Sequence, residues 1–128
     1  MVNWVGILFV RNMKVLMVKE KGKDFVMLPG GRVEAGEDPE QTLLREVKEE
    51  IEVEPSNIRF YSTYELVGKH EGEVMRFKVY ECDLEVGKIK PKGDIEAVEW
   101  VDTGDVESGR IKTGSVTSLK IFPELKRK

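Results

Sequence analysis

Three glutamates in the middle of the chain, Glu46, Glu49 and Glu50, have the spacing that gathers carboxylates on one side of a helix. At about 100° per residue, positions i, i+3 and i+4 fall within one arc about 100° wide. These carboxylates repel one another, and they lie in the C-terminal half of the predicted helix, where the macrodipole disfavours negative charge. A divalent cation relieves such repulsion, because Mg²⁺ takes oxygen ligands from carboxylates and substrate phosphates. The spacing therefore indicates a metal site suited to phosphate chemistry.

A solvated acidic helix face is the alternative interpretation of the same residues. Arg45 and Lys48 lie beside the glutamates and would balance part of their charge. Acidic faces of this kind are common on surface helices. The charge pattern alone leaves both interpretations open.

The helix that must position these glutamates has clear boundary signals. Asp38 is a good N-cap, Pro39 suits the first helical position, and Gln41 stands where a capping box requires Glu or Gln. We therefore predict a helix from Pro39 to Ile51. The stripe expected to pack on the core consists of Leu43, Leu44, Val47 and Ile51.

The stretch Gly31 to Val53 resembles the Nudix box, G-x5-E-x7-R-E-U-x-E-E-x-G-U, where U is a bulky aliphatic residue. It covers 23 of 128 residues, and eight of the nine specified positions agree. The resemblance implies an α/β (α+β) fold, a Nudix-like α/β/α sandwich around a central mixed β-sheet, formed by residues 1–128 as one domain. It also implies Mg²⁺ as cofactor, with Mn²⁺ as a substitute.

Roles for individual residues also follow from the resemblance. It implies that Glu46, Glu49 and Glu50 are metal ligands and that Arg45 orients Glu46 or Glu49. One glutamate, from the box or from outside it, is expected to activate the attacking water. Glu96, among the acidic residues near the predicted strand Ala97–Val101, is the candidate from outside; a surface glutamate is the alternative.

The one departure from the box is Glu52, which stands where the family has glycine. A residue just after a helix usually adopts a left-handed conformation, which costs a non-glycine residue about 1 kcal/mol. The alternative is that the helix continues toward Pro55. Neither outcome removes a carboxylate from the predicted metal site.

The glycine-rich loop before the helix supplies further candidates. Gly30 and Gly31 allow a phosphate to approach backbone amides, although tight turns also require glycine. Arg32 is a candidate phosphate ligand, with a solvated surface arginine as the alternative. Glu37 matches a loop glutamate of the family and is expected to support the site.

The remaining segments read mainly as strands. Two hairpins are expected, one joining Met1–Val10 to Met13–Glu20 and one joining Ile58–Val67 to Val74–Leu84. Tyr64 and Arg76 of the second hairpin are candidate substrate contacts, and core packing or exposure is the alternative. A short helical turn within Asp102–Gly109 and a last helix starting at Ser115 or Thr117 complete the prediction.

Composition narrows the class of protein. The net charge of −3 and pI near 5.4 argue against a nucleic-acid polymer as partner, because phosphate-backbone binders carry a basic face. No apolar run reaches about 18 residues and no signal-peptide pattern opens the chain, so no membrane partner is expected. The single cysteine, Cys82, fits a reducing compartment. We expect a cytoplasmic monomer or homodimer.

The function expected from the resemblance is hydrolysis of a pyrophosphate linkage in a nucleoside diphosphate joined to another moiety. A nucleoside triphosphate or an oxidised nucleotide, in a clean-up role, is the expected substrate. The alternatives are a dinucleoside polyphosphate or ADP-ribose hydrolase, a non-catalytic nucleotide-binding sensor, and a structural interaction module.

Overall fold

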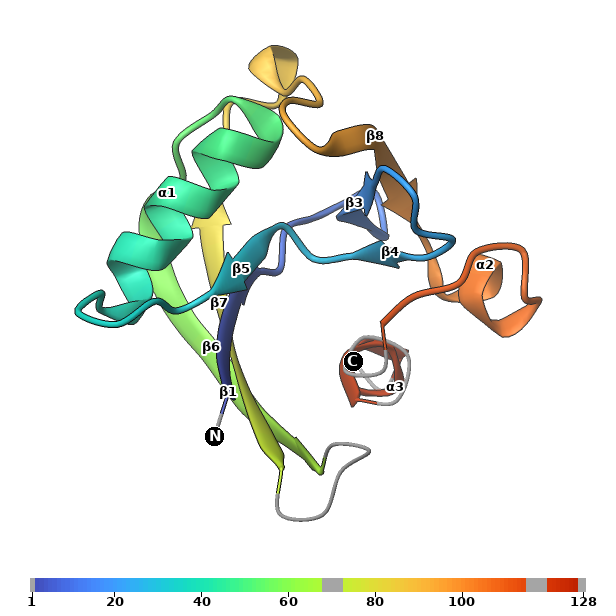
Figure 1. Cartoon of the computed structure of the whole chain (residues 1–128). Helices are drawn as coiled ribbons and strands as arrows, with labels where there is room; N and C mark the ends of the chain where they lie inside the picture. Colours follow the sequence, from blue (N-terminus) through green and yellow to red (C-terminus); the bar gives the residue numbers. More distant parts are fainter. Residues whose placement is uncertain (1, 68–72, 115–119, 127–128) are drawn as a thin grey trace.

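The structure, a computed structural model, describes residues 2–67, 73–114 and 120–126 (Figure 1). The strands are β1 (Val2–Ile7), β2 (Val10–Arg11), β3 (Lys14–Glu20), β4 (Val26–Met27), β5 (Gly30–Arg32), β6 (Ser56–Val67), β7 (Val74–Asp83) and β8 (Ile95–Val101). The helices are α1 (Pro39–Ile51), a 3₁₀ turn η1 (Val86–Lys88), α2 (Thr103–Glu107) and α3 (Phe122–Lys126). No helix in the described residues is long and apolar enough to cross a membrane.

The strands form two four-stranded sheets. The first has the order β5-β1-β7-β6, with β1 parallel to β7 and the other neighbours antiparallel. In the second, β3 is hydrogen bonded to β2, β4 and β8, all antiparallel. The predicted mixed α+β fold with a central mixed sheet is confirmed.

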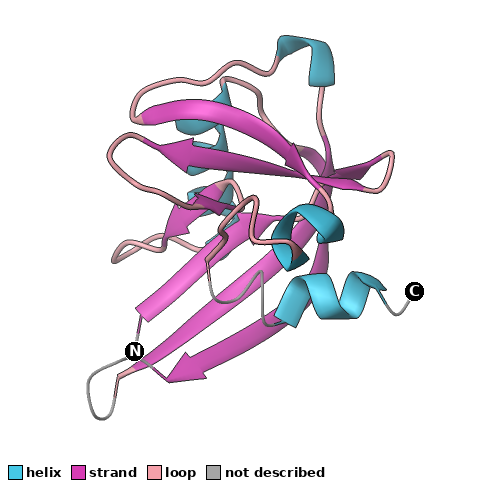
Figure 2. Cartoon of the chain, turned by 90° about the vertical axis from the view of Figure 1, so that its right-hand side faces the viewer, coloured by secondary structure: helices cyan, strands magenta, loops and turns pink. Residues whose placement is uncertain are grey.

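Two clusters of buried apolar side chains pack the layers of the fold together. Side chains of α1, including Leu43, Val47 and Ile51, pack with Val5 and Ile7 of β1 in the first cluster. The second cluster lies on the opposite side of the first sheet and contains the start of α3. Helix α1 therefore covers one side of this sheet, and α2 and α3 lie on the other (Figures 1 and 2).

Helix α1 begins and ends where the sequence predicts. The Asp38 side chain accepts a hydrogen bond from the Gln41 backbone N–H at 2.9 Å, and Gln41 Oε1 accepts from the Asp38 N–H at 3.1 Å. Glu52 ends the helix with φ 71° and ψ −7°, and its N–H donates to the Lys48 carbonyl. Of the two outcomes considered for Glu52, the left-handed conformation is therefore the one observed.

The predicted core stripe of α1 is wrong at one position. Leu44 is 40% exposed, whereas Glu50 is only 9% exposed. At about 100° per residue Leu44 lies at the far edge of the arc centred on Leu43 and Val47, while Glu50 lies about 20° from Leu43. Glu50 therefore belongs to the buried arc of the helix as well as to the acidic one.

The first predicted hairpin is also wrong in its pairing. Strand β1 pairs with β5 and β7 in the first sheet, and only Val10 and Arg11 pair back onto β3. Asn12 and Met13 both have positive φ, as the tight turn between these short segments requires. Between β1 and β2 the chain passes from the first sheet to the second. The hairpin prediction failed because two apolar runs joined by a turn need not pair along their whole length.

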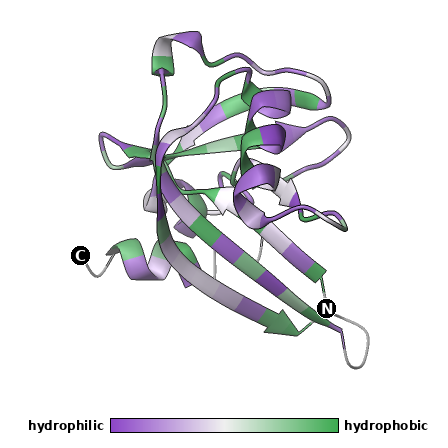
Figure 3. Cartoon of the chain, turned by 90° about the vertical axis from the view of Figure 1, so that its left-hand side faces the viewer, coloured by the Kyte–Doolittle hydropathy of each residue, from purple (hydrophilic) through white to green (hydrophobic). Residues whose placement is uncertain are grey.

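The second predicted hairpin is confirmed, since β6 and β7 pair antiparallel from Ser56–Asp83 to Val67–Val74. Hydrophobic and hydrophilic residues alternate along β7, as expected for a strand with two different faces (Figure 3). Helix α2 confirms the helical turn expected after Val101. The predicted start of the last helix, Ser115 or Thr117, lies outside the described residues.

Candidate active site

Arg45 joins the loop before α1 to the glutamates of α1. Its Nε and Nη2 donate to the two carboxylate oxygens of Glu37, each at 2.9 Å, and its Nη1 donates to Glu46 Oε1 at 2.9 Å. The same Nη1 lies 3.7 Å from Glu49 Oε1. Arg45 therefore lies beside the acidic face and orients Glu46 directly.

Glu37 is fixed by this contact and by a second contact with helix α1. Besides the paired hydrogen bonds from Arg45, Glu37 Oε1 accepts from the Thr42 hydroxyl at 3.1 Å, and Thr42 is buried. The hydrogen bonds from Arg45 lower the pKa of Glu37 to about 2. Glu37 is thus ionised at neutral pH and keeps the Arg45 side chain in one orientation.

Glu50 is the buried carboxyl of the site. Its Oε1 accepts a 2.8 Å hydrogen bond from the backbone N–H of Gly30. Burial, together with the nearby carboxylates of Glu46 and Glu20, raises the pKa of Glu50 to about 8 against the lowering effect of the Gly30 hydrogen bond. An ionised Glu50 therefore needs a positive charge near it that the folded chain does not fully supply.

The other two glutamates of the acidic face, Glu46 and Glu49, are progressively more open to solvent. Burial raises the pKa of Glu46, and the Arg45 guanidinium opposes this shift. The Glu49 side chain is 60% exposed and lies at the outer edge of the acidic arc. One helix face thus presents three carboxyl groups that differ in exposure: Glu50 is buried, Glu46 is half-buried and Glu49 is exposed.

The two glycines of β5, Gly30 and Gly31, have steric roles in this arrangement. A Cβ on Gly30, at φ +150°, would lie 2.0 Å from the Val5 carbonyl oxygen. A Cβ on Gly31 would lie 2.5 Å from the carboxyl carbon of Glu46. Gly30 thus permits close pairing of β5 with β1, and Gly31 leaves room for Glu46. The Gly30 amide predicted to face a phosphate instead donates to Glu50.

An open cleft of about 630 Å³ runs along the glutamate face of α1. Besides Glu46, Glu49 and Glu50 of α1, its acidic lining includes Glu20, at the end of β3, and Asp94, just before β8. Three cationic side chains also line the cleft: Arg45, Lys48 and Lys92. The site therefore combines segments that lie more than 70 residues apart in the chain.

Glu20, Lys92 and Asp94 were not among the residues selected from the sequence. They reach the site because β3 and β8 pair antiparallel, with Glu20 opposite Ile95. The loop before β8 is tied down as well, since the Lys92 N–H donates to the Glu50 carbonyl at 2.9 Å and the Lys21 N–H donates to the Asp94 carbonyl at 2.9 Å. The only sequence signal was the cluster of acidic residues near Ala97.

Glu96 is not brought to this cleft. Its carboxylate is exposed and forms an ion pair with Lys19 on the neighbouring strand β3, and this hydrogen bond lowers the pKa of Glu96. Ile95 is buried, and successive side chains of a strand point to opposite faces. A cleft lined by Ile95 therefore leaves Glu96 facing away.

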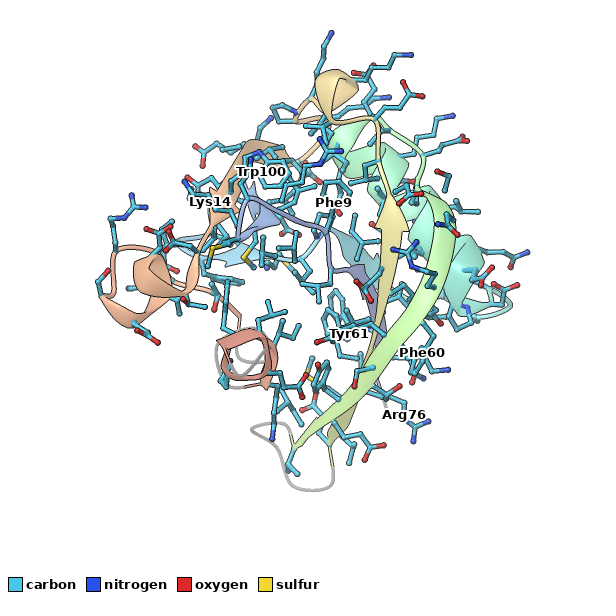
Figure 4. The ribbon with its side chains drawn as sticks, turned by 180° about the vertical axis from the view of Figure 1, so that it is seen from behind. Phe9, Lys14, Phe60, Tyr61, Arg76 and Trp100 are labelled. Carbon is cyan, nitrogen blue, oxygen red and sulfur yellow. The ribbon has the colours of Figure 1, made fainter. Side chains whose placement is uncertain are left out.

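Three predicted substrate contacts also lie elsewhere. Tyr64 is buried in the second apolar cluster, and its hydroxyl donates to Glu124 Oε2 of α3 at 2.7 Å. Arg76 is directed outward from the first sheet and donates two hydrogen bonds to Glu65 Oε1 (Figure 4). Arg32 is exposed on β5 opposite Trp4. Tyr64 and Arg76 thus have partners within the fold.

The donor set suits a hard divalent cation in its chemistry. Carboxylate oxygens are the ligands such cations prefer, and a buried carboxyl with a raised pKa gains from a nearby positive charge. Across residues 2–67, 73–114 and 120–126, no three acidic, histidine or cysteine side chains converge closely enough to enclose an ion. Glu46, Glu49 and Glu50 would therefore share such a cation with oxygen ligands from substrate or water.

Comparisons with known proteins identify the family of the chain. The NUDIX domain model matches residues 2–125. An 8-oxo-dGTP diphosphatase from Haemophilus influenzae is 30% identical over 93 residues, which cover 70% of this chain and 66% of that protein. An ADP-ribose pyrophosphatase from Methanocaldococcus jannaschii is 31% identical over 97 residues, covering 73% and 57%. The chain thus spans less than two thirds of the length of either relative.

The fold is shared with solved structures at low sequence identity. A MutT protein from Bacillus halodurans superposes with a TM-score of 0.75 at 20% identity, covering 96% of this chain and 80% of that one. The family match extends over nearly the whole chain and includes the loop, the helix and the carboxylates described above. The chain belongs to the NUDIX domain family.

Proposed function

We propose that the protein is a Mg²⁺-dependent hydrolase that cleaves the pyrophosphate linkage of a nucleoside diphosphate joined to another moiety. The observation that carries the proposal is the set of three carboxylates, Glu46, Glu49 and Glu50, presented by one helix face to an open cleft. A nucleoside triphosphate or an oxidised nucleotide is the proposed substrate. The name of the Haemophilus influenzae relative, 8-oxo-dGTP diphosphatase, supports this choice.

The proposed reaction is attack of water on a phosphorus atom of the linkage, with the bond from that phosphorus to the bridging oxygen breaking. A divalent cation, when bound, supplies Lewis-acid chemistry and neutralises phosphate charge. Glu46 and Glu50 are held by Arg45 and Gly30 and would bind and orient the reactants. Glu49 is the preferred acceptor of the water proton, because it lines the cleft and is largely exposed.

In this proposal, Arg45 and Glu37 support the reacting groups indirectly. Arg45 makes two hydrogen bonds to Glu37 and one to Glu46, which leaves little of its guanidinium for substrate. Its proposed role is to hold Glu46 in one orientation. For the role of an additional acidic residue from outside the helix, Asp94 is better placed than Glu96, because Asp94 lines the cleft and Glu96 is paired with Lys19.

Hydrolysis of ADP-ribose is a second candidate, because the Methanocaldococcus jannaschii relative is named an ADP-ribose pyrophosphatase. Dinucleoside polyphosphates have the same type of linkage and belong in the same test.

A non-catalytic sensor is disfavoured, since every carboxylate of the box is present. Small nucleotides rather than a nucleic-acid polymer fit a cleft with five acidic side chains, and the buried single cysteine fits a cytoplasmic protein.

The test is release of phosphate, pyrophosphate or nucleoside monophosphate from a panel of substrates, with and without Mg²⁺. The panel contains nucleoside triphosphates, 8-oxo-dGTP, dinucleoside polyphosphates, ADP-ribose and nucleotide sugars. Glu50→Gln is expected to lower kcat by about 10² or more on the true substrate, because an essential charged group is lost.

The matched control is Glu54→Gln, a glutamate just after α1 that does not line the cleft and is expected to keep wild-type activity. Metal-dependent turnover that is equal in wild type and Glu50→Gln would contradict the assigned site. Tight Mg²⁺-dependent binding of a nucleotide without turnover of any panel member would favour the sensor.

A further inference from the structure

Lys92 differs from the other two cationic residues of the cleft in that its side chain has no ion-pair partner among the described residues. Arg45 is hydrogen bonded to Glu37 and Glu46, and the Lys48 ammonium lies 3.1 Å from Glu54. Lys92 forms no ion pair with any residue in the described part of the chain, although five acidic side chains line the same cleft. Its ammonium is therefore the cationic group of the cleft that stays available to an anion.

The backbone of Lys92 is fixed even though its side chain is exposed. Its N–H donates to the Glu50 carbonyl at 2.9 Å, and its carbonyl accepts from the Ile95 N–H at 3.0 Å. Gly93 follows with φ +58°, and a Cβ added at this position would lie 3.6 Å from the Glu49 carbonyl oxygen. The loop thus places the Lys92 backbone beside the last turn of α1, which carries Glu49 and Glu50.

We propose that Lys92 is a substrate-positioning residue that binds a phosphate beyond the two joined by the scissile linkage. This inference rests on the proposed function, in which the glutamate face takes that linkage. A nucleoside triphosphate has such an additional phosphate, whereas ADP-ribose has a neutral ribose in its place. Lys92 therefore favours the triphosphate class of substrate, because an ammonium gains a charge-assisted hydrogen bond only from the anionic group.

A purely structural role makes a different prediction. A lysine beside the C-terminus of a helix interacts favourably with the helix dipole, and its removal then lowers stability without changing substrate binding. Thermal unfolding separates this role from substrate positioning. Lys90 is the matched control, because it lies in the same loop, is exposed, and donates its N–H to the Ile51 carbonyl but does not line the cleft.

The experiment compares Lys92→Met, Lys92→Arg and Lys90→Met with the wild type at saturating Mg²⁺. For dGTP, Lys92→Met is expected to raise KM about tenfold with kcat changed less than about twofold, since one charged hydrogen bond to the substrate is lost. Lys92→Arg is expected to restore most of the affinity, and Lys90→Met to behave as wild type. For ADP-ribose, KM should change less than about threefold in every variant, since its ribose offers no charge to the ammonium.

Binding of a non-hydrolysable α,β-methylene analogue of dGTP, measured by calorimetry, completes the test. If the wild type binds the analogue without turning over any substrate, the proposed hydrolase fails, and a tenfold loss of binding in Lys92→Met still supports the inference. If the wild type hydrolyses dGTP and Lys92→Met leaves KM unchanged, or changes KM equally for ADP-ribose, the inference is overturned while the hydrolase stands. If the wild type neither binds nor hydrolyses, both fail.

Discussion

The backbone N–H of Gly30 donates a 2.8 Å hydrogen bond to the carboxyl of Glu50, twenty residues further along the chain. This contact joins the start of strand β5 to the last turn of α1. It holds a buried carboxyl whose pKa is raised to about 8. One amide thus fixes the position of the least exposed acidic group in the cleft.

The stability of the metal-free protein should depend on the ionisation of Glu50. The pKa of Glu50 is about 8 in the folded state against an ordinary value of 4.5, so the folded state binds the proton more tightly than the unfolded state. Its contribution to stability is complete below pH 4.5 and is lost as the pH rises through about 8. In EDTA, the Tm of the wild type should fall from pH 6 to pH 9 more than that of Glu50→Gln.

The control for this prediction is Glu54→Gln, which should keep the wild-type dependence of Tm on pH because Glu54 is exposed. Equal slopes in wild type and Glu50→Gln would show that another group titrates. Added Mg²⁺ should reduce the loss of stability at pH 9, since it binds the ionised carboxyl.

The two glycines should respond differently to alanine. Gly31→Ala places a Cβ against the flexible end of Glu46, so the folded protein should persist while kcat falls by about 10² through displacement of a charged group. Gly30→Ala places a Cβ against the Val5 carbonyl at a φ that L-residues avoid, so unfolding should be the main effect. Circular dichroism and turnover on one sample of each variant distinguish the two effects, and a fully active Gly31→Ala would contradict the first.

Arg45→Lys should release both carboxylates that the guanidinium holds. An ammonium cannot donate in parallel to Glu37 and also reach Glu46 with the geometry of the fork. We expect kcat to fall by about tenfold or more, the loss that follows from misplacing one charged group. The pKa of Glu37, lowered by these hydrogen bonds, should rise toward its ordinary value. Carbon NMR of the Glu37 carboxyl measures this rise, and an unchanged titration would show that Arg45 is not its cause.

Glu52→Gly should stabilise the protein without affecting turnover. Glu52 has φ 71°, a conformation that costs a non-glycine residue about 1 kcal/mol and that glycine adopts readily. The free energy of unfolding in urea should therefore rise by up to about 1 kcal/mol. Glu52→Ala serves as control because it removes the charge but keeps the Cβ, and a gain of the same size in Glu52→Ala would assign the effect to charge instead.

Local geometry made much of the site predictable from the sequence. The cap at Asp38, the span of α1 and the common face of Glu46, Glu49 and Glu50 depend on residues within a few positions of one another. Helical periodicity fixes such relations once the helix forms. The burial of Glu50 could also have been recognised, since it lies about 20° from Leu43 around the helix.

The tertiary structure decided the rest. The apolar run at the N-terminus does not encode whether it pairs with β3 or with β7, and the structure places it beside β7. Pairing of β3 with β8 brings Glu20, Lys92 and Asp94 to the cleft and turns Glu96 toward Lys19. A two-residue period specifies the faces of a strand but not its neighbour. The sequence by itself therefore determined the helix and its carboxylates, and only long-range strand pairing determined which other charges surround them.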